Sequence, residues 1–226
     1  MNKMFDQLLH IDTEILLAIN GQHAPWADTL MWIISEKTTW IPLYLLLMGL
    51  LVWRYHKPTP ATIKCLQHVP VCVVMIVVIA LAVGAADFIA SGILKDWVAR
   101  PRPSRVPELE GILHLVNDYR SGQYGFVSSH ASTTMACALL FSLIWRNKIT
   151  TLGLMLWVAM NCYSRMYLGV HYPLDIIGGL LVGTIVAVVA HVLLRWAKVL
   201  DYPATKVQSN CMGSGVNEAF GQCGDL

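Results

Sequence analysis

The sequence predicts an all-α fold: a polytopic transmembrane helical bundle of about five spans, preceded by an amphipathic helix at the membrane surface. Of the 226 residues, 56% are hydrophobic and only 13% are charged, a balance far from that of a water-soluble domain. The uninterrupted apolar runs 69–86 and 176–194 are long enough to cross the hydrocarbon core of a bilayer. A chain of this length cannot surround several such helices with a polar shell of its own, which argues against a soluble protein.

The first twenty residues are predicted to form a helix that lies along the membrane surface. Apolar side chains recur there at steps of four and three, at Met4, Leu8, Ile11, Ile15 and Ile19. Polar residues lie off this face, as expected for an interfacial helix. Acidic residues among the apolar ones argue against a signal peptide.

The spans that follow are expected at 40–53, 68–95, 129–145, 149–163 and 173–194. The first is short for a crossing and is expected to borrow residues before it. A non-helical stretch with three prolines runs from Arg100 to about Tyr124. Residues 1–198 are therefore expected to form one membrane domain, and the polar residues 199–226 a loosely ordered tail.

Basic residues of the short loops gather at one end of the threaded bundle: Arg54, Lys57, Lys64, Arg146, Lys148, Arg195 and Lys198. That end is predicted to be cytoplasmic by the positive-inside bias. The 96–128 loop and the 164–173 segment then face outward together. Because the basic residues are otherwise dispersed, no nucleic-acid partner is expected. The sequence leaves the oligomeric state open.

Three cations are predicted at the outward ends of the spans: Lys95, Arg102 and Arg165. An ionisable residue within a membrane costs about 2.5–3.5 kcal/mol on insertion scales, so such residues suggest function. Converging in one pocket, the three would match a phosphate group. The competing interpretation is snorkelling to lipid headgroups. It is weaker for three cations beside two histidines, but it is the interpretation adopted for Arg100 and Arg105.

Two histidines accompany these cations. Ser128, Ser129 and His130 stand where a span begins, so backbone N–H groups there can face an anion. Capping of the helix by serine is the alternative, and both roles can hold together. His171 precedes the last span. Asp175 can hydrogen-bond one of its ring nitrogens, which leaves the other ring nitrogen free to act as a nucleophile. Asp175 could instead only complement the helix dipole.

No metal or other cofactor is expected. The histidine, cysteine and carboxylate residues do not form a cluster with the spacing of metal ligands. The neighbouring cations would also repel a metal ion.

The three outward segments resemble the signature of the type 2 phosphatidic acid phosphatase family, whose fold is shared with vanadium haloperoxidases. The family's first motif is Lys, six residues, Arg-Pro, which Lys95 and Arg102-Pro103 match. The third is Ser-Arg, five residues, His, three residues, Asp, which 164–175 matches throughout. The second is normally Pro-Ser-Gly-His, whereas 127–130 is Val-Ser-Ser-His. The similarity covers about residues 84–180, and the joint spacing is highly specific.

The resemblance implies a role for each matched residue. His171 would attack phosphorus and form a phosphohistidine, Asp175 would orient it, and His130 would protonate the leaving oxygen. The phosphate oxygens would be held by Lys95, Arg102, Ser128, Ser129 and Arg165. The family requires no metal. A bacterial member of the family would be an inner-membrane protein, and by the positive-inside bias its site would face the periplasm.

The substrate is expected to be a lipid phosphate, with membrane lipids as the other partners. Undecaprenyl pyrophosphate, phosphatidylglycerophosphate, phosphatidic acid and lipid A are all compatible, with prenyl pyrophosphate slightly ahead. A lipid phosphotransferase using the same histidine is one alternative, and a haloperoxidase is a weaker one because those relatives are typically soluble. A non-catalytic protein that binds anionic lipids is the alternative from another class.

Overall fold

The structure, a computed structural model, describes residues 3–57 and 68–201. Within these ranges the chain forms helices and no β-strand. The longer elements are α1 (Lys3–Asn20), α2 (Pro25–Ser35), η1 (Lys37–Trp40), α3 (Ile41–Tyr55), α4 (Val71–Asp87), η3 (Phe88–Leu94), α5 (Lys95–Val98), α6 (Ser129–Trp145), α7 (Lys148–Tyr167) and α8 (Pro173–Trp196). Short 3-10 turns are η4 (Pro103–Arg105), η5 (Pro107–Leu109), η6 (Val116–Asp118) and η7 (Val199–Asp201).

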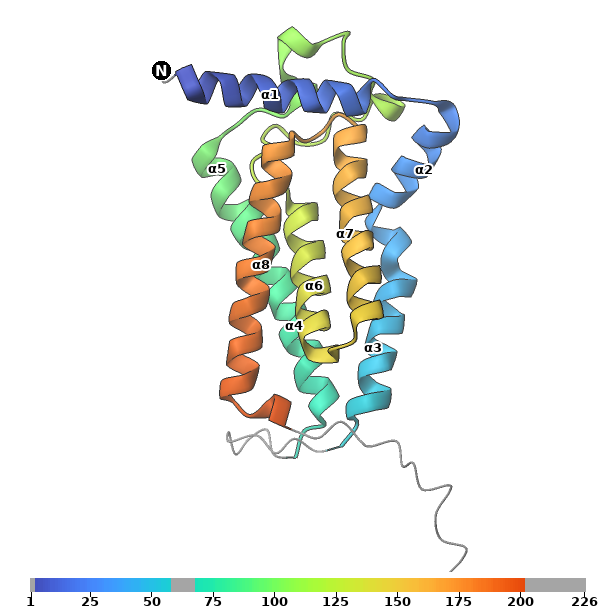
Figure 1. Ribbon diagram of the computed structural model, residues 1–226, viewed down its shortest axis with the longest axis vertical. Coiled ribbons are helices and arrows are strands. Elements are labelled where there is room, and N and C mark those ends of the chain that lie inside the picture. Colours follow the sequence, from blue (N-terminus) through green and yellow to red (C-terminus); the bar gives the residue numbers. More distant parts are fainter. Residues whose placement is uncertain (1–2, 58–67, 202–226) are drawn as a thin grey trace, which may run out of the picture.

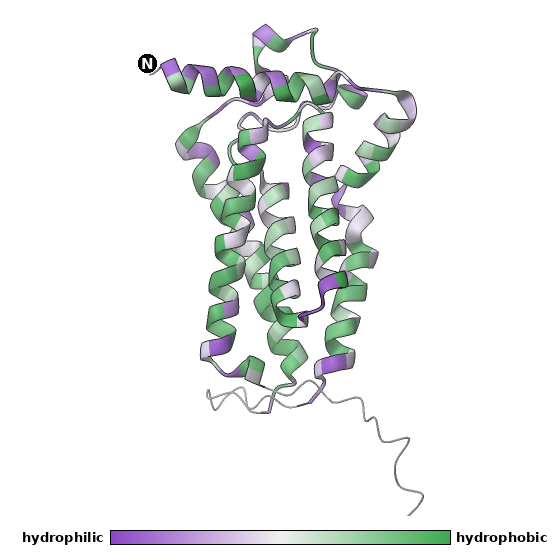
Figure 2. Ribbon diagram, in the orientation of Figure 1, coloured by the Kyte–Doolittle hydropathy of each residue, from purple (hydrophilic) through white to green (hydrophobic). Residues whose placement is uncertain are grey.

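Helices α3, α4, α6, α7 and α8 run along the long axis of the molecule, with α6 packed against α4, α7 and α8 (Figure 1). Their shared core is apolar and includes Leu51, Met75, Leu140 and Phe141. Figure 2 shows hydrophobic residues along the length of the bundle and hydrophilic residues at its two ends. Residues 71–98 and α8 are long and apolar enough to cross a membrane. The full set of five spans stays a prediction.

Two helix boundaries differ from the sequence prediction in ways that matter for the site. The span expected at 40–53 is α3, but the residues before it form the separate elements α2 and η1. The break occurs because Glu36 has an extended backbone. Helix α7 continues to Tyr167, so Arg165 projects from its last turn. By contrast, α6 has the predicted limits.

Glycines allow α6 and α8 to approach closely where the site begins. A Cβ atom on Gly179 would lie 2.4 Å from the Ser128 carbonyl oxygen, and one on Gly183 would lie 2.4 Å from that of Ser132. At the same end the Ser128 N–H donates to the Asp175 carbonyl oxygen (2.9 Å). This contact fixes the start of α6 beside the start of α8.

Helix α1 crosses one end of the bundle at a steep angle to the other helices (Figure 1). Three of its own residues are buried, Asp12, Leu16 and Asn20. Its exposed apolar side chains include Met4, Phe5, Leu8, Ile11 and Ile15. The described helix α1 thus exposes apolar side chains along its length, and its assignment as an amphipathic helix at a membrane surface stays a prediction.

The basic loop residues that the structure describes lie at the opposite end of the bundle from α1. Arg54, Arg146 and Arg195 stand at the ends of α3, α6 and α8 there (Figure 1). Lys64 and residues 202–226 of the predicted tail lie outside the described residues. The first tail residue, Val199, is buried.

Candidate active site

The predicted site residues meet at the end of the bundle beneath α1. Electrostatic effects on His171 come from Arg102, Arg165, Lys95 and His130. Arg102 follows α5, and Arg165 lies in the last turn of α7. Lys95 begins α5, and His130 lies in the first turn of α6. The structure thus brings the three motif segments together around one imidazole.

The His171 side chain is 1% exposed and is held on both ring nitrogens. Its Nδ1 lies 3.3 Å from Asp175 Oδ2, and Arg102 Nη1 lies 2.8 Å from its Nε2. A carboxylate accepts a hydrogen bond and a guanidinium donates one. The ring proton therefore belongs on Nδ1, and the lone pair belongs on Nε2. Burial, and then the positive charge of Arg102, hold the pKa of His171 well below its usual value. The neutral ring therefore offers Nε2 as a nucleophile.

The two buried arginines, Arg102 and Arg165, have more hydrogen-bond donors than their contacts within the protein use. Arg102 Nη1 also donates to the Val170 carbonyl oxygen (3.1 Å), and Arg165 Nη1 donates to Ser35 Oγ. In the part of the chain that is described, Nε of each arginine is buried without a hydrogen-bond partner. Burial lowers the pKa of Arg102 to about 10, so it stays charged at neutral pH. Buried unpaired donors are costly, and a bound anion would satisfy them.

The other predicted phosphate ligands lie at the start of α6. Lys95 Nζ donates to Ser129 Oγ (3.3 Å) and to Ser91 Oγ (3.4 Å). Ser128 is fully buried, and its Oγ accepts the Ala131 N–H (3.4 Å) as a helix cap. Its contacts are thus within the protein, and the predicted contact between Ser128 and phosphate stays untested.

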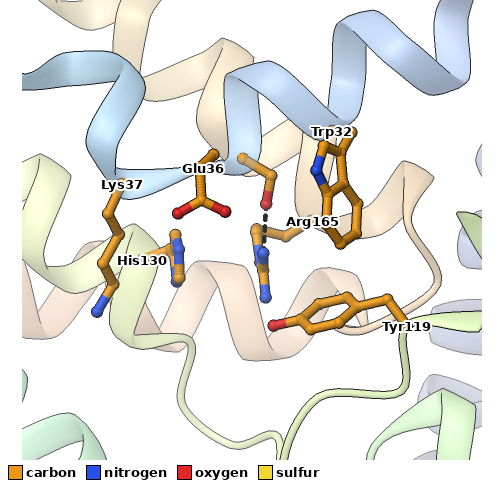
Figure 3. A pocket seen from close by; sticks show the side chains of 7 residues that line it. Trp32, Glu36, Lys37, Tyr119, His130 and Arg165 are labelled. Atoms are coloured by element: carbon orange, nitrogen blue, oxygen red, sulfur yellow. Dashed lines mark hydrogen bonds between the residues drawn. The ribbon is translucent and has the colours of Figure 1, made fainter. Parts of the chain in front are cut away.

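His130 lines a cavity of about 140 Å³ together with Trp32, Ser35, Glu36, Lys37, Tyr119 and Arg165. We call it the His130 cavity. Figure 3 shows its imidazole between Lys37 on one side and Arg165 on the other, with the Glu36 carboxylate above it and with Trp32 and Tyr119 beyond the arginine. The ring is also hydrogen-bonded to the Ser35 backbone. None of the residues from α2 to η1 was predicted to belong to the site.

Arg100 was assigned to headgroup snorkelling, and this assignment is wrong. Its Nη1 lies 3.1 Å from Asp175 Oδ1 and its Nη2 lies 2.6 Å from Asp12 Oδ2. The guanidinium also stacks 4.0 Å from the centre of the Tyr172 ring. Asp12 in turn accepts the Leu174 N–H (2.8 Å). The Arg105 side chain instead donates to the carbonyl oxygen of Ser121 (2.8 Å) in an exposed contact.

A metal site was not expected. Over residues 3–57 and 68–201, no group of three or more histidine, cysteine, aspartate or glutamate side chains is placed to hold a metal ion. Whether the reaction is independent of metal stays a prediction.

Comparison with known proteins decides the family. The model of the PAP2 superfamily matches residues 67–198, more than half of the chain. The chain belongs to the PAP2 superfamily. The resemblance found in the motifs is thereby confirmed.

The relatives of this PAP2 chain include two curated bacterial proteins. It is 34% identical to the lipid A 4'-phosphatase of Bacteroides thetaiotaomicron over 80% of this chain and 75% of the relative. Identity is also 34% with the lipid A 4'-phosphatase of Porphyromonas gingivalis, over 80% of this chain and 72% of the relative. The crystal structure of Aquifex aeolicus LpxE matches with a TM-score of 0.59 at 21% identity, over 79% of this chain and 93% of that one. This last match supports the fold.

Proposed function

We propose that this PAP2 chain is a membrane-embedded lipid phosphatase that hydrolyses a phosphate monoester of a glycolipid of the lipid A type and releases inorganic phosphate. The observation that carries the proposal is the buried His171, held between Asp175 and Arg102 with its lone pair on Nε2, the nitrogen that accepts the hydrogen bond from Arg102. The outward, periplasmic face of a bacterial inner membrane is its proposed location.

In the first step, His171 Nε2 attacks phosphorus while the bond from phosphorus to the ester oxygen breaks. His130 gives its proton to that oxygen, so the lipid leaves as an alcohol. Asp175 stabilises the positive charge that forms on the His171 ring. Lys95, Arg102 and Arg165 neutralise the phosphoryl oxygens in the transition state.

In the second step, water attacks the phosphohistidine. His130, now neutral, accepts the proton of that water, the bond from nitrogen to phosphorus breaks, and inorganic phosphate leaves. Both histidines return to their starting states. Each step uses only groups of this chain, the substrate and water.

The relatives change the order of candidate substrates. Sequence motifs alone placed prenyl pyrophosphate slightly ahead, whereas two curated relatives that each match over 80% of the chain are lipid A 4'-phosphatases. A putative undecaprenyl-diphosphatase, YbjG of Escherichia coli, matches over only 30% of this chain. Lipid A is therefore the first substrate to offer.

The test is release of inorganic phosphate from lipid A by the purified protein in detergent with a chelator present. We expect the His171→Ala and His130→Ala variants each to lose at least about 1,000-fold in kcat, because each removes a group that takes part in the chemical step. When the reaction is quenched with base during turnover, phosphate should be found bound covalently to His171. Unchanged activity in either variant would remove that histidine from the mechanism.

Loss of phosphate from lipid A without release of inorganic phosphate would instead indicate a phosphotransferase. Activity that disappears only with the chelator would contradict metal independence.

A further inference from the structure

We propose that the His130 cavity is a binding subsite for the sugar ring that carries the scissile phosphate. This inference rests on the proposed function and deepens it, because it assigns recognition of the leaving group to residues outside the family motifs. The residues are Trp32 of α2, Tyr119 directly after η6, and Glu36 and Lys37 between α2 and α3.

The position of the cavity follows from the proposed chemistry. The leaving oxygen must lie within hydrogen-bonding reach of His130, since His130 protonates it. His130 and Arg165 line the cavity, whereas His171 and Arg102 are not among its lining residues. A phosphoryl group held against His171 and Arg165 would therefore direct its ester oxygen, and the ring attached to it, into the cavity.

One wall of the cavity is aromatic. The rings of Trp32 and Tyr119 pack edge to face with centroids 5.3 Å apart, and the Arg165 guanidinium lies 5.9 Å from the Tyr119 ring centre. Both aromatic side chains are half-buried, so part of each ring remains accessible. Aromatic rings with one polar edge suit a ligand that has both C–H faces and hydroxyl groups.

The opposite wall is polar and mixed in charge. Glu36 and Lys37 are exposed neighbours on that wall (Figure 3). The carboxylate can accept hydrogen bonds from hydroxyl groups and the ammonium can donate to hydroxyl or amide oxygens. Because Glu36 offsets the charge of Lys37, this wall has no net positive charge for a second phosphate. The combination favours a sugar ring over the distal phosphate of a pyrophosphate.

The experiment compares two substrates that differ in the group that carries phosphate. The Trp32→Ala and Glu36→Gln variants are assayed on lipid A and on phosphatidic acid in the same detergent. We expect the ratio of kcat/KM for lipid A to that for phosphatidic acid to fall about 10-fold or more in each variant, the scale of losing one or two specific contacts. Trp26→Ala is the matched control, since Trp26 lies on the same helix and is 72% exposed; its ratio should equal that of the wild type.

An unchanged ratio in both variants, with wild-type protein active on lipid A, would overturn the subsite and leave the proposed function standing. Wild-type protein that releases phosphate from phosphatidic acid but not from lipid A, or from neither, would overturn the substrate proposal and the subsite with it. If Trp32→Ala does not fold, Glu36→Gln decides, because Glu36 is exposed and its amide has nearly the same shape.

Discussion

The imidazole of His171 lies between a carboxylate and a guanidinium, and this arrangement determines both its tautomer and its protonation. Asp175 holds Nδ1, while Arg102 points a donor at Nε2. A protonated ring would have no acceptor for that donor and would add a positive charge beside Arg102. The site therefore favours the neutral, nucleophilic form.

The pH dependence of kcat/KM should reflect this depressed pKa. Protonation of His171 removes the attacking lone pair, and burial together with Arg102 moves that protonation to lower pH. Activity should thus persist well below pH 6.5, the usual pKa of histidine. An initial-rate profile at low substrate concentration measures it. An acidic limb centred at or above pH 6.5 would contradict the prediction.

Asp12 is predicted to position Asp175 through Arg100. Its carboxylate shares the Arg100 guanidinium with Asp175 (2.6 and 3.1 Å). In Asp12→Asn, Arg100 has only one carboxylate partner, Asp175, and neutralises more of its negative charge. Asp175 then stabilises the His171 imidazolium less well. We expect kcat to fall about 10-fold, the scale of one weakened charged contact, with a smaller change in KM.

The acidic limb of the Asp12→Asn profile should also move to lower pH, because removal of a negative charge disfavours protonation of His171. Asp12→Glu should recover part of kcat. Asp6→Asn, an exposed acid on the same helix, is the control. A fall in folded protein with an unmoved acidic limb would mean that Asp12 is only structural.

At the scale of elements, the contact between α6 and α8 positions the start of each helix at the site. The contact requires glycine at 179 and 183, since a Cβ atom at either would lie 2.4 Å from a carbonyl oxygen of the facing helix. Backbone atoms cannot move aside as a flexible side chain can. Substitution must therefore separate the helices.

Gly183→Ala is predicted to destabilise the protein by about 1–3 kcal/mol, the usual cost of overpacking. The matched control is Gly153→Ala on α7, where an added Cβ atom meets nothing within 4 Å. That change should be neutral or stabilising by up to about 1 kcal/mol, because alanine favours the helix. Thermal unfolding in detergent measures both. Equal melting temperatures of the two variants would refute the packing argument.

Helix α1 and the segment from α2 to η1 have a different role from the bundle helices. Both lie at the site end of the molecule (Figure 1). One contributes Asp12 and the other contributes Glu36 and Lys37. These N-terminal elements thus complete a site whose motif residues come from 95–175.

At the scale of the molecule, the basic loop ends and the site lie at opposite ends of the bundle. This arrangement predicts that the site faces the periplasm. A cysteine introduced at Glu108, exposed in the site-end loop, should react with an impermeant thiol reagent in intact cells. Lys148→Cys, exposed at the other end, should react only after permeabilisation.

Labelling of the unchanged chain gives the background for this topology test, because the chain already has six cysteines, of which Cys72, Cys137 and Cys162 are buried. The reverse pattern of labelling would place the site on the cytoplasmic side.

The sequence by itself determined the helical class, the limits of α6 and the identity of the motif residues. Apolar run length and the spacing of ionisable residues are local properties, so they can be recognised without the fold. The spacing within 164–175 already placed Asp175 one helical turn after His171, and their contact follows from it.

The tertiary structure alone decided which residues support and surround that motif. Arg100 pairs with acids 75 and 88 positions away in the chain, and Ser35 meets Arg165 from 130 positions away. No periodicity links such residues, because their proximity arises from the packing of whole helices. For this reason Arg100 was wrongly assigned to the membrane surface, and the residues before α3 were not connected with the site.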